Sequence, residues 1–337
     1  MSFDPAILKT LSRNERPSEA QLRDALTSIL SGEAASEQIS ALLLGLEMIG
    51  LSSRELRVGT EVMRANMRPV RVEADVIDIV GTGGTGLHTL SISTATALVS
   101  ASAGAVVAKH GNRAASSLTG TADTLSELGL DLSISPERAG QIIGEVGIGF
   151  LFAPNHHPAM RHVGPARKAL GIRTLFNMLG PMSNPAGAKR MLLGVCDDRW
   201  RKPMAEALND LGAEHVWVVH GEDGLDEVTT TARTFVTEVK DGALRELTVT
   251  PDMFDIPKAS LAELRGGAPA DNANALTALL DGVAGPYRDI VRLNAGVALM
   301  LAGVVPSVEG GIELATRAID DGAARDTLQR LRAATRA

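Results

Sequence analysis

The sequence predicts an α/β protein with a small helical N-terminal domain and a large α/β domain whose central sheet is mostly parallel. Helical patterns alone fill residues 1 to about 70, short β-branched runs then alternate with helical stretches, and the pattern from Asn272 onward is helical again. The length of 337 residues is ample for two domains. We therefore expect a helical domain over residues 1–70 and an α/β domain over 71–337.

The expected N-terminal helices begin at recognisable caps. Ser18 with Gln21, and Ser52 with Glu55, have the spacing of capping boxes, in which each side chain accepts a backbone amide proton from the other residue. The helix after Ser18 has one apolar face, formed by Leu22, Ala25, Leu26, Ile29 and Leu30. The run 41–51 is apolar nearly all round, which predicts burial between other helices or against a second subunit.

The middle of the chain alternates strands with helices. β-branched runs predict strands at 76–80, 105–108, 149–152, 191–195 and 215–219. Helical stretches at 136–146 and 201–211 lie between them, so we expect helices on both faces of the sheet. Near the C-terminus, the Gly-Pro pair at 285–286 predicts a helix break and the Gly-Gly pair at 310–311 predicts a turn.

Composition argues against several classes of protein. Lys and Arg number 33 against 40 Asp and Glu, a formal net charge of −7, and aromatic residues are only 3%, so nucleic acid is not an expected partner. The single cysteine, Cys196, excludes a disulfide framework or a Cys-based zinc site and suits a cytoplasmic location. Because neither a secretory signal nor an apolar window of ~18 to 20 residues is found, we expect a soluble protein with no membrane partner.

A glycine-rich loop is the most informative stretch of the chain. After the expected strand at 76–80, GTGGTG at 81–86 places four glycines in six residues, and Ser91, Ser93 and Thr94 follow at an expected helix start. Backbone amides and hydroxyls can converge there on an anion beside the positive end of the helix. The loop also fits the dinucleotide-binding pattern GxGxxG, which by itself is weak evidence.

A gap in the acidic residues decides how that loop is interpreted. Dinucleotide binding needs an acidic residue about 20 positions on, yet residues 79–122 contain no Asp or Glu, where the average composition would give about five. Lys109, His110 and Arg113 lie inside this gap, which suits a polyanion. An ordinary turn with surface cations remains the alternative, and the loop does not end in the Gly-Lys-Ser/Thr of a P-loop.

An acidic cluster follows the expected strand at 215–219. Its members are Glu222, Asp223, Asp226 and Glu227, which repel one another unless they are solvated or bridged. Oxygen ligands of this kind suit Mg²⁺ shared with a substrate phosphate, although a solvated acidic turn is the alternative. Together, the glycine loop and the acidic cluster predict a metal-assisted enzyme that acts on a phosphate ester.

The segment 152–185 is rich in His and Arg. Three histidines within residues 156–162 lack acidic or Cys neighbours and the HExxH spacing, so a zinc site is not expected. The arginines could clamp a carboxylate through two parallel hydrogen bonds. Surface or packing roles are equally open for Arg161 and Arg173.

Several motifs together resemble the anthranilate phosphoribosyltransferase family, in the same order along the chain. They are GTGG at 81–84, SIST at 91–94, KHGNR at 109–113 with SS at 116–117, GTAD at 120–123, the segment 155–185 and the acidic segment 220–227. The resemblance implies a nucleoside phosphorylase-like phosphoribosyltransferase fold. It also implies a homodimer formed through the helical domain, which a returning segment near 165–185 completes.

The resemblance implies a reaction and a set of site residues. Anthranilate and phosphoribosyl pyrophosphate (PRPP) would give N-(5-phosphoribosyl)anthranilate and pyrophosphate, a step of tryptophan synthesis, with two Mg²⁺ ions. The residues implied for PRPP are Gly81, Gly84, Thr85, Thr89, Ser91, Ile92, Ser93, Thr94, Lys109, His110, Gly111, Asn112, Arg113, Ala114, Ala115, Ser116, Ser117 and Thr121. Those implied for anthranilate are Gly81, Asn112, His157 and Arg167, those for Mg²⁺ are Ser93, Asp226 and Glu227, and the candidates for catalysis are Lys109 and His110.

The chain departs from the family pattern at two positions, where Thr85 replaces an Asp and Ser91 replaces an Asn. Both can still hydrogen-bond a phosphate oxygen, so we expect activity with a changed metal or PRPP dependence. A pyrimidine nucleoside phosphorylase-like enzyme, or a PRPP transferase for a different amine, is the nearest alternative. The Arg167 segment favours an acceptor with a carboxylate. A non-catalytic nucleic-acid-binding paralogue is the second alternative, which the net charge disfavours.

Overall fold

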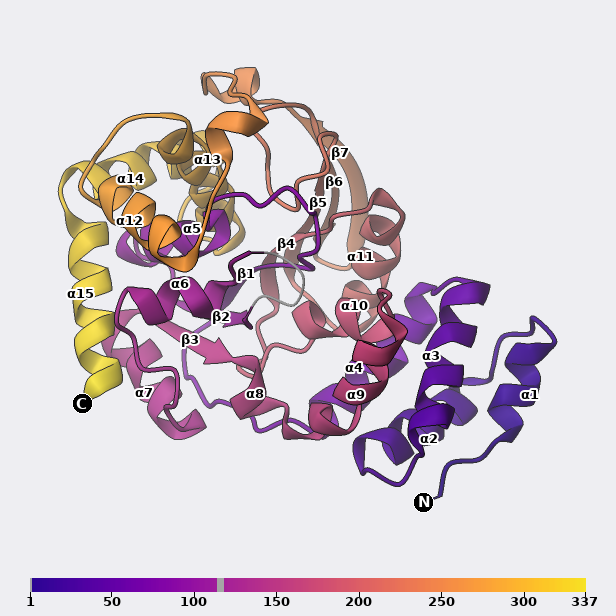
Figure 1. Cartoon of the computed structure of the whole chain (residues 1–337). Coiled ribbons are helices and arrows are strands. Elements are labelled where there is room, and N and C mark those ends of the chain that lie inside the picture. Colours follow the sequence, from indigo (N-terminus) through magenta and orange to yellow (C-terminus); the bar gives the residue numbers. More distant parts are fainter. Residues whose placement is uncertain (1, 114–117) are drawn as a thin grey trace.

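The computed structural model describes residues 2–113 and 118–337, in which N-terminal helices lie beside an α/β unit (Figure 1). The first four helices are α1 (Ala6–Ser12), α2 (Glu19–Leu30), α3 (Ser36–Ile49) and α4 (Ser53–Ala65). The predicted apolar face of α2 is buried, and the capping box of Ser18 with Gln21 is confirmed. Four of the residues implied for PRPP, Ala114, Ala115, Ser116 and Ser117, lie outside the described residues.

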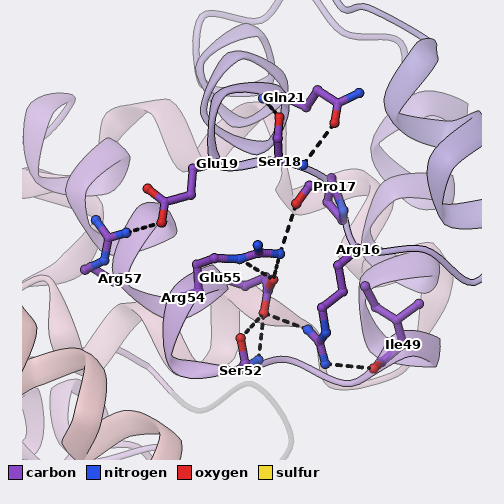
Figure 2. Close-up of polar contacts among 10 residues, drawn as sticks. All are labelled: Arg16, Pro17, Ser18, Glu19, Gln21, Ile49, Ser52, Arg54, Glu55 and Arg57. Atoms are coloured by element: carbon purple, nitrogen blue, oxygen red, sulfur yellow. Dashed lines mark hydrogen bonds and ion pairs between the residues drawn. The ribbon is translucent and has the colours of Figure 1, made fainter.

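A buried carboxylate organises the start of α4 (Figure 2). Glu55 is fully buried and accepts from the Ser52 amide at 2.8 Å and from Arg16 and Arg54, each at 2.9 Å. The Ser52 hydroxyl donates to the same carboxylate, so only the Glu55 half of the predicted capping box forms as expected. Because Arg16 also donates to the carbonyl of Ile49, this cluster ties the α1–α2 connection to the end of α3.

Two later helices return to this helical region. They are α9 (Gly164–Leu170) and α10 (Leu175–Met182), which contact α3 and α4 respectively. A Cβ atom on Gly59 of α4 would lie 2.8 Å from Leu179 of α10, so glycine permits this close approach. Two short elements, α8 (Ala153–His156) and η1 (Pro158–His162), lead into the returning segment.

One sheet of seven strands, in the order β3-β2-β1-β4-β5-β6-β7, lies within the described residues. The strands are β1 (Ile77–Gly81), β2 (Val107–Gly111), β3 (Ile148–Phe152), β4 (Arg190–Gly194), β5 (His215–Gly221), β6 (Thr234–Lys240) and β7 (Ala243–Val249). The first five are parallel, which confirms the predicted strands to within three residues. The antiparallel hairpin of β6 and β7 was not predicted.

Alternate strand residues divide between the two faces of the sheet. Leu192 and Trp217 pack with α5 (Ile92–Ser102) and the C-terminal helices, whereas Leu193 and Val218 pack with α11 (Arg201–Asp210) and the N-terminal helices. The remaining α-helices are α5 (Ile92–Ser102), α6 (Thr121–Glu127), α7 (Pro136–Val146), α11 (Arg201–Asp210), α12 (Pro269–Leu280), α13 (Pro286–Leu301), α14 (Val308–Asp320) and α15 (Ala323–Arg336). Short 3-10 helices are η2 (Asp198–Trp200), η3 (Pro251–Phe254) and η4 (Leu261–Leu264).

The C-terminal region is helical as predicted, with one error. The predicted turn at residues 310–311 is wrong, because both glycines lie inside α14. A Cβ atom on Gly311 would lie 2.4 Å from the carbonyl oxygen of Gly296 on α13, so these glycines allow the two helices to pack closely. Among the described residues, no helix has the length and apolar character needed to cross a bilayer.

Candidate active site

The candidate site lies where neighbouring parallel strands end. Strands β2, β1, β4 and β5 end at Gly111, Gly81, Gly194 and Gly221. A Cβ atom on Gly81 would lie 2.3 Å from a carboxylate oxygen of Asp226. A Cβ atom on Gly194 would lie only 1.7 Å from the backbone carbonyl oxygen of Asp226. The ends of β1 and β4 therefore need glycine so that Asp226 can lie directly against the sheet.

The glycine loop joins β1 to α5 and is held from two sides. Gly83, Gly84 and Gly86 have φ angles of 60°, 75° and 71°, in the left-handed region that favours glycine. The Gly83 amide donates to Asp226 at 2.9 Å, and Arg173 donates to the Gly83 carbonyl at 2.7 Å. The loop is thus braced to the acidic segment and to the segment between α9 and α10.

The acidic cluster divides into two functional halves. Glu222 pairs with Arg233, and Asp223 accepts from the Leu225 amide and from threonine hydroxyls, so both serve the turn itself. Asp226 and Glu227 instead face the glycine loop and the start of α5. The alternative interpretation of the acidic cluster as a solvated turn therefore fits Glu222 but does not fit Asp226 and Glu227.

Asp226 and Glu227 form an electrostatically strained pair. Both keep partial contact with solvent, yet protein surrounds most of each carboxylate. Burial raises the pKa of both, and the charge of Asp226 helps raise the pKa of Glu227 to about 8. A divalent cation would relieve this repulsion, so the donor set suits Mg²⁺. The described residues hold no cluster of three or more His, Cys, Asp or Glu able to bind a metal alone, so Ser93 and substrate oxygens would complete the shell.

The Lys109 side chain on β2 extends toward Ser93 and the Asp226–Glu227 pair. Its ammonium group donates to the Ile79 carbonyl at 2.5 Å and to the Ser93 hydroxyl at 3.2 Å. Burial lowers the pKa of Lys109, and the carboxylates of Asp78, Glu227 and Asp226 oppose that effect. Lys109 therefore supplies a buried positive charge next to the candidate metal ligands.

Asp78 supports β2 from inside the sheet. It is fully buried and accepts from the His110 amide at 3.1 Å and from the Asn184 side chain at 2.6 Å. Burial raises the pKa of Asp78 to about 6, although the charge of Lys109 lowers it. Asn184 also donates to the Ala108 carbonyl, so Asp78 and Asn184 together fix the backbone on which Lys109 and His110 lie.

His110, which follows Lys109 on β2, packs against a second buried histidine, His157. The rings of His110 and His157 are 5.1 Å apart, and His110 Nδ1 is 3.1 Å from the Gly180 carbonyl. That carbonyl only accepts, so Nδ1 carries the proton and Nε2, which has no partner among the described residues, is a free acceptor. Burial lowers the pKa of His110 well below its usual range and that of His157 to about 4, so both rings are neutral at pH 7.

The candidate anthranilate residues lie on separate elements. Arg167 on α9 has no side-chain hydrogen bond or ion pair within the described residues, and burial followed by the charge of Arg173 lowers its pKa. Asn112 is exposed directly after β2, where its side-chain oxygen accepts from the Arg113 amide. Arg113 pairs with Asp123 at 2.8 Å, so its charge is already engaged.

The other residues implied for PRPP surround the glycine loop. Ile92 and Thr94 are buried, and the Ile92 amide already donates to the Leu90 carbonyl at 2.8 Å, so only backbone amides after Ile92 could be available at the start of α5. Thr85 accepts from the Leu87 amide through its hydroxyl, and Thr89 pairs with Arg265 in an isolated bridge. Ser91 contacts Thr124 and Asn272 rather than facing the loop. Gly84 and Gly111 lie in the loop and at the end of β2, and Thr121 begins α6.

Sequence reasoning missed several supporting residues. Arg173 braces the glycine loop, although its sequence context left surface or packing roles open. Asn184 and Asn294 are polar residues within apolar stretches, and both are buried and fully engaged. For Asn294, an amide in an otherwise apolar helix pattern was the available signal, since burying it without a partner is costly.

Comparisons with known proteins agree with this arrangement. Residues 5–67 match the glycosyl transferase family, helical bundle domain, and residues 73–325 match the glycosyl transferase family, a/b domain. The chain is 52% identical to the anthranilate phosphoribosyltransferase of Parvibaculum lavamentivorans, over 98% of this chain and 96% of that protein.

Solved structures extend the similarity to the whole fold. The crystal structure of anthranilate phosphoribosyltransferase from Thermus thermophilus has a TM-score of 0.93 and 43% identity, covering 98% of this chain and 99% of that one. The enzyme from Saccharomyces cerevisiae in complex with PRPP and Mg has a TM-score of 0.91 and 27% identity, covering 98% and 97%. On the sequence identity over nearly the full length, the chain belongs to the anthranilate phosphoribosyltransferase family.

Proposed function

We propose that this chain transfers the phosphoribosyl group of PRPP to the amine of anthranilate, giving N-(5-phosphoribosyl)anthranilate and pyrophosphate in tryptophan synthesis. The observation that carries the proposal is the bond from the Gly83 amide to Asp226, because it joins an anion-binding loop to a carboxylate pair that suits a metal. Family membership supports the same reaction.

Stabilisation of the leaving pyrophosphate is the main catalytic task. The bond from ribose C1 to pyrophosphate breaks, and the bond from C1 to the anthranilate nitrogen forms, while positive charge develops on the sugar. The Lys109 ammonium group and the amides of the glycine loop and of the α5 N-terminus would bind the phosphate oxygens. Mg²⁺ bound by Ser93, Asp226 and Glu227 would neutralise charge on the pyrophosphate, and two ions follow from the family resemblance.

The acceptor substrate needs orientation more than activation. The Arg167 guanidinium group has no partner among the described residues, which suits it to bind the carboxylate of anthranilate, and Asn112, His157 and Gly81 would line the remainder of that site. The aromatic amine is neutral at pH 7 and loses one proton when the new bond forms. His110 is the candidate acceptor of that proton, because hydrogen bonding of Nδ1 to Gly180 leaves Nε2 unprotonated, although burial lowers the pKa of His110 and makes it a weak base.

The helical domain of residues 1–70, completed by the segment 165–185, would form a homodimer. Leu44 and Met48 on α3 are 43% and 76% exposed, and Ile172 is 43% exposed. Exposed apolar side chains on the helical region support an interface with a second copy. Sedimentation equilibrium should give twice the mass of 35.3 kDa. We also propose a cytoplasmic location, which the single cysteine supports.

A substrate panel tests the proposed reaction. Loss of anthranilate fluorescence in the presence of PRPP and Mg²⁺ is the expected result, with no turnover of either substrate alone. Phosphorolysis of a pyrimidine nucleoside, or PRPP-dependent consumption of a different amine, without turnover of anthranilate would refute the proposal.

A further inference from the structure

A buried asparagine on α13 holds the backbone that follows the acidic pair. The Val228 amide donates to Asn294 Oδ1 at 2.9 Å, and Asn294 Nδ2 donates to the Val228 carbonyl at 2.8 Å. Asn294 is fully buried and Val228 is 1% exposed. One side chain therefore satisfies both backbone groups of the residue next to Glu227, where water cannot replace it.

The chemistry of this contact requires an amide side chain. Only a group with both a donor and an acceptor can pair with a backbone N–H and C=O at once. Asn294 Nδ2 is also anchored to the carbonyl of Ile290 within α13 at 2.8 Å, so its own orientation is fixed. The contacts of Asn294 thereby tie the backbone next to Glu227, and so the direction of the Glu227 side chain, to α13.

Helix α13 also contacts the segment that carries Ser93, the other candidate metal ligand. Tyr287 lies two turns before Asn294, and its hydroxyl donates to the Ser91 carbonyl at 3.0 Å. Ser91 precedes α5, whose second residue is Ser93. Helices α13 and α5 pack directly against each other, so α13 sets the position of both segments.

We propose that Asn294 is a positioning residue which, together with Tyr287, fixes the separation between Ser93 and the Asp226–Glu227 pair. The inference rests on the proposed function, because it assigns these residues to the geometry of the same metal site. Supporting residues around a metal commonly alter its affinity by 10- to 100-fold when replaced. A purely structural role would lower stability and leave metal affinity unchanged.

The test measures Mn²⁺ binding in the presence of pyrophosphate by electron paramagnetic resonance, with thermal unfolding measured in parallel. Asn294→Leu should weaken Mn²⁺ binding about 10-fold or more. Asn294→Asp keeps the acceptor for the Val228 amide and should weaken it less, as should Tyr287→Phe. Leu299→Ala, at a fully buried position on the same helix, should lower the unfolding temperature without changing Mn²⁺ affinity.

Two results would overturn the inference, and they are distinguishable. Wild-type Mn²⁺ affinity in folded Asn294→Asp and Tyr287→Phe would remove the positioning role while leaving the proposed metal site intact, even if Asn294→Leu did not fold. No Mn²⁺ binding by the unsubstituted protein would refute the metal site and this inference together. Steady-state kinetics should agree, with a raised half-saturating Mg²⁺ concentration and an unchanged KM for anthranilate.

Discussion

Replacing Gly194 with alanine should displace the acidic segment from the sheet. The added Cβ atom would lie 1.7 Å from the carbonyl oxygen and 2.3 Å from the carbonyl carbon of Asp226. Both are backbone atoms, so no side-chain rotation can relieve the contact. The φ angle of Gly194 lies outside the left-handed region, and the effect of Gly194→Ala therefore comes from space alone.

The displacement can be estimated from these distances. Ordinary contact between the Cβ atom and the oxygen requires the two to separate by about 1.7 Å more. A misplacement of about 1 Å in a catalytic group commonly costs about 100-fold in rate. We expect Gly194→Ala to lower kcat/KM by about 100-fold or more, which corresponds to roughly 2.7 kcal/mol of transition-state stabilisation.

The assay follows anthranilate fluorescence at several PRPP and Mg²⁺ concentrations. Gly144→Ala is the matched control, because a Cβ atom at this position in α7 would have no neighbour within 4 Å. Alanine is also favoured over glycine inside a helix, so this variant should keep full activity and equal or higher stability. A Gly194→Ala protein with kcat/KM within threefold of wild type would show that the position of Asp226 does not control catalysis.

Three further predictions concern single side chains. Arg167→Ala should raise the KM for anthranilate at least 10-fold and leave that for PRPP within twofold, and equal effects on both would remove Arg167 from the acceptor site. Thr85→Asp should steepen the Mg²⁺ dependence of the rate and raise the KM for PRPP at low Mg²⁺ concentration. A unit charge ~6 Å from the PRPP phosphate is worth about 2 to 3 kcal/mol at an effective dielectric near 20. Identical rates for the two proteins across all PRPP and Mg²⁺ concentrations would contradict this prediction. Glu55→Ala should lower the free energy of unfolding by about 2 kcal/mol in urea, against at most about 0.5 kcal/mol for the exposed Glu145→Ala. Burial opposes ionisation of Glu55, but hydrogen bonds from Ser52 and Arg54 outweigh burial and lower the pKa of Glu55. The stabilisation by Glu55 is therefore present above about pH 4.5 and is lost as the pH falls through the pKa of the folded state. The free energy of unfolding of the wild-type protein should show the same pH dependence.

Local patterns were enough to predict most of the fold. The alternation of β-branched runs and helical stretches located the five parallel strands, because buried strands and amphipathic helices have distinct periods. The sequence did contain a signal for the missed hairpin, the Asp241-Gly242 pair, because Asp-Gly favours the positive φ angles of a two-residue hairpin turn. The two residues have φ angles of 50° and 82° and connect the paired strands β6 and β7. The error at residues 310–311 had a tertiary cause, because glycine there serves the packing of two helices.

The candidate site was predictable only in part. The acidic gap and the glycine loop pointed to an anion site from composition and spacing alone. Composition and spacing did not reveal which carboxylates face that loop, because Glu222 and Asp226 differ only in their partners after folding; Asp226 and Glu227 were singled out by the family resemblance alone. The contacts of Asn184 and Asn294 join segments 106 and 66 residues apart, so a local pattern could mark the buried amide of Asn294 but could not reveal the partners of either residue.

The proposed metal-assisted transfer is tested most directly by removing both candidate carboxylates at once. The rate of anthranilate consumption with PRPP should rise with Mg²⁺ for the wild-type protein. The double variant Asp226→Ala/Glu227→Ala should lose at least about 1,000-fold of that rate, while its unfolding temperature stays within a few degrees of wild type. A folded double variant that retains most of the Mg²⁺-dependent rate would contradict the assignment of these carboxylates to the metal.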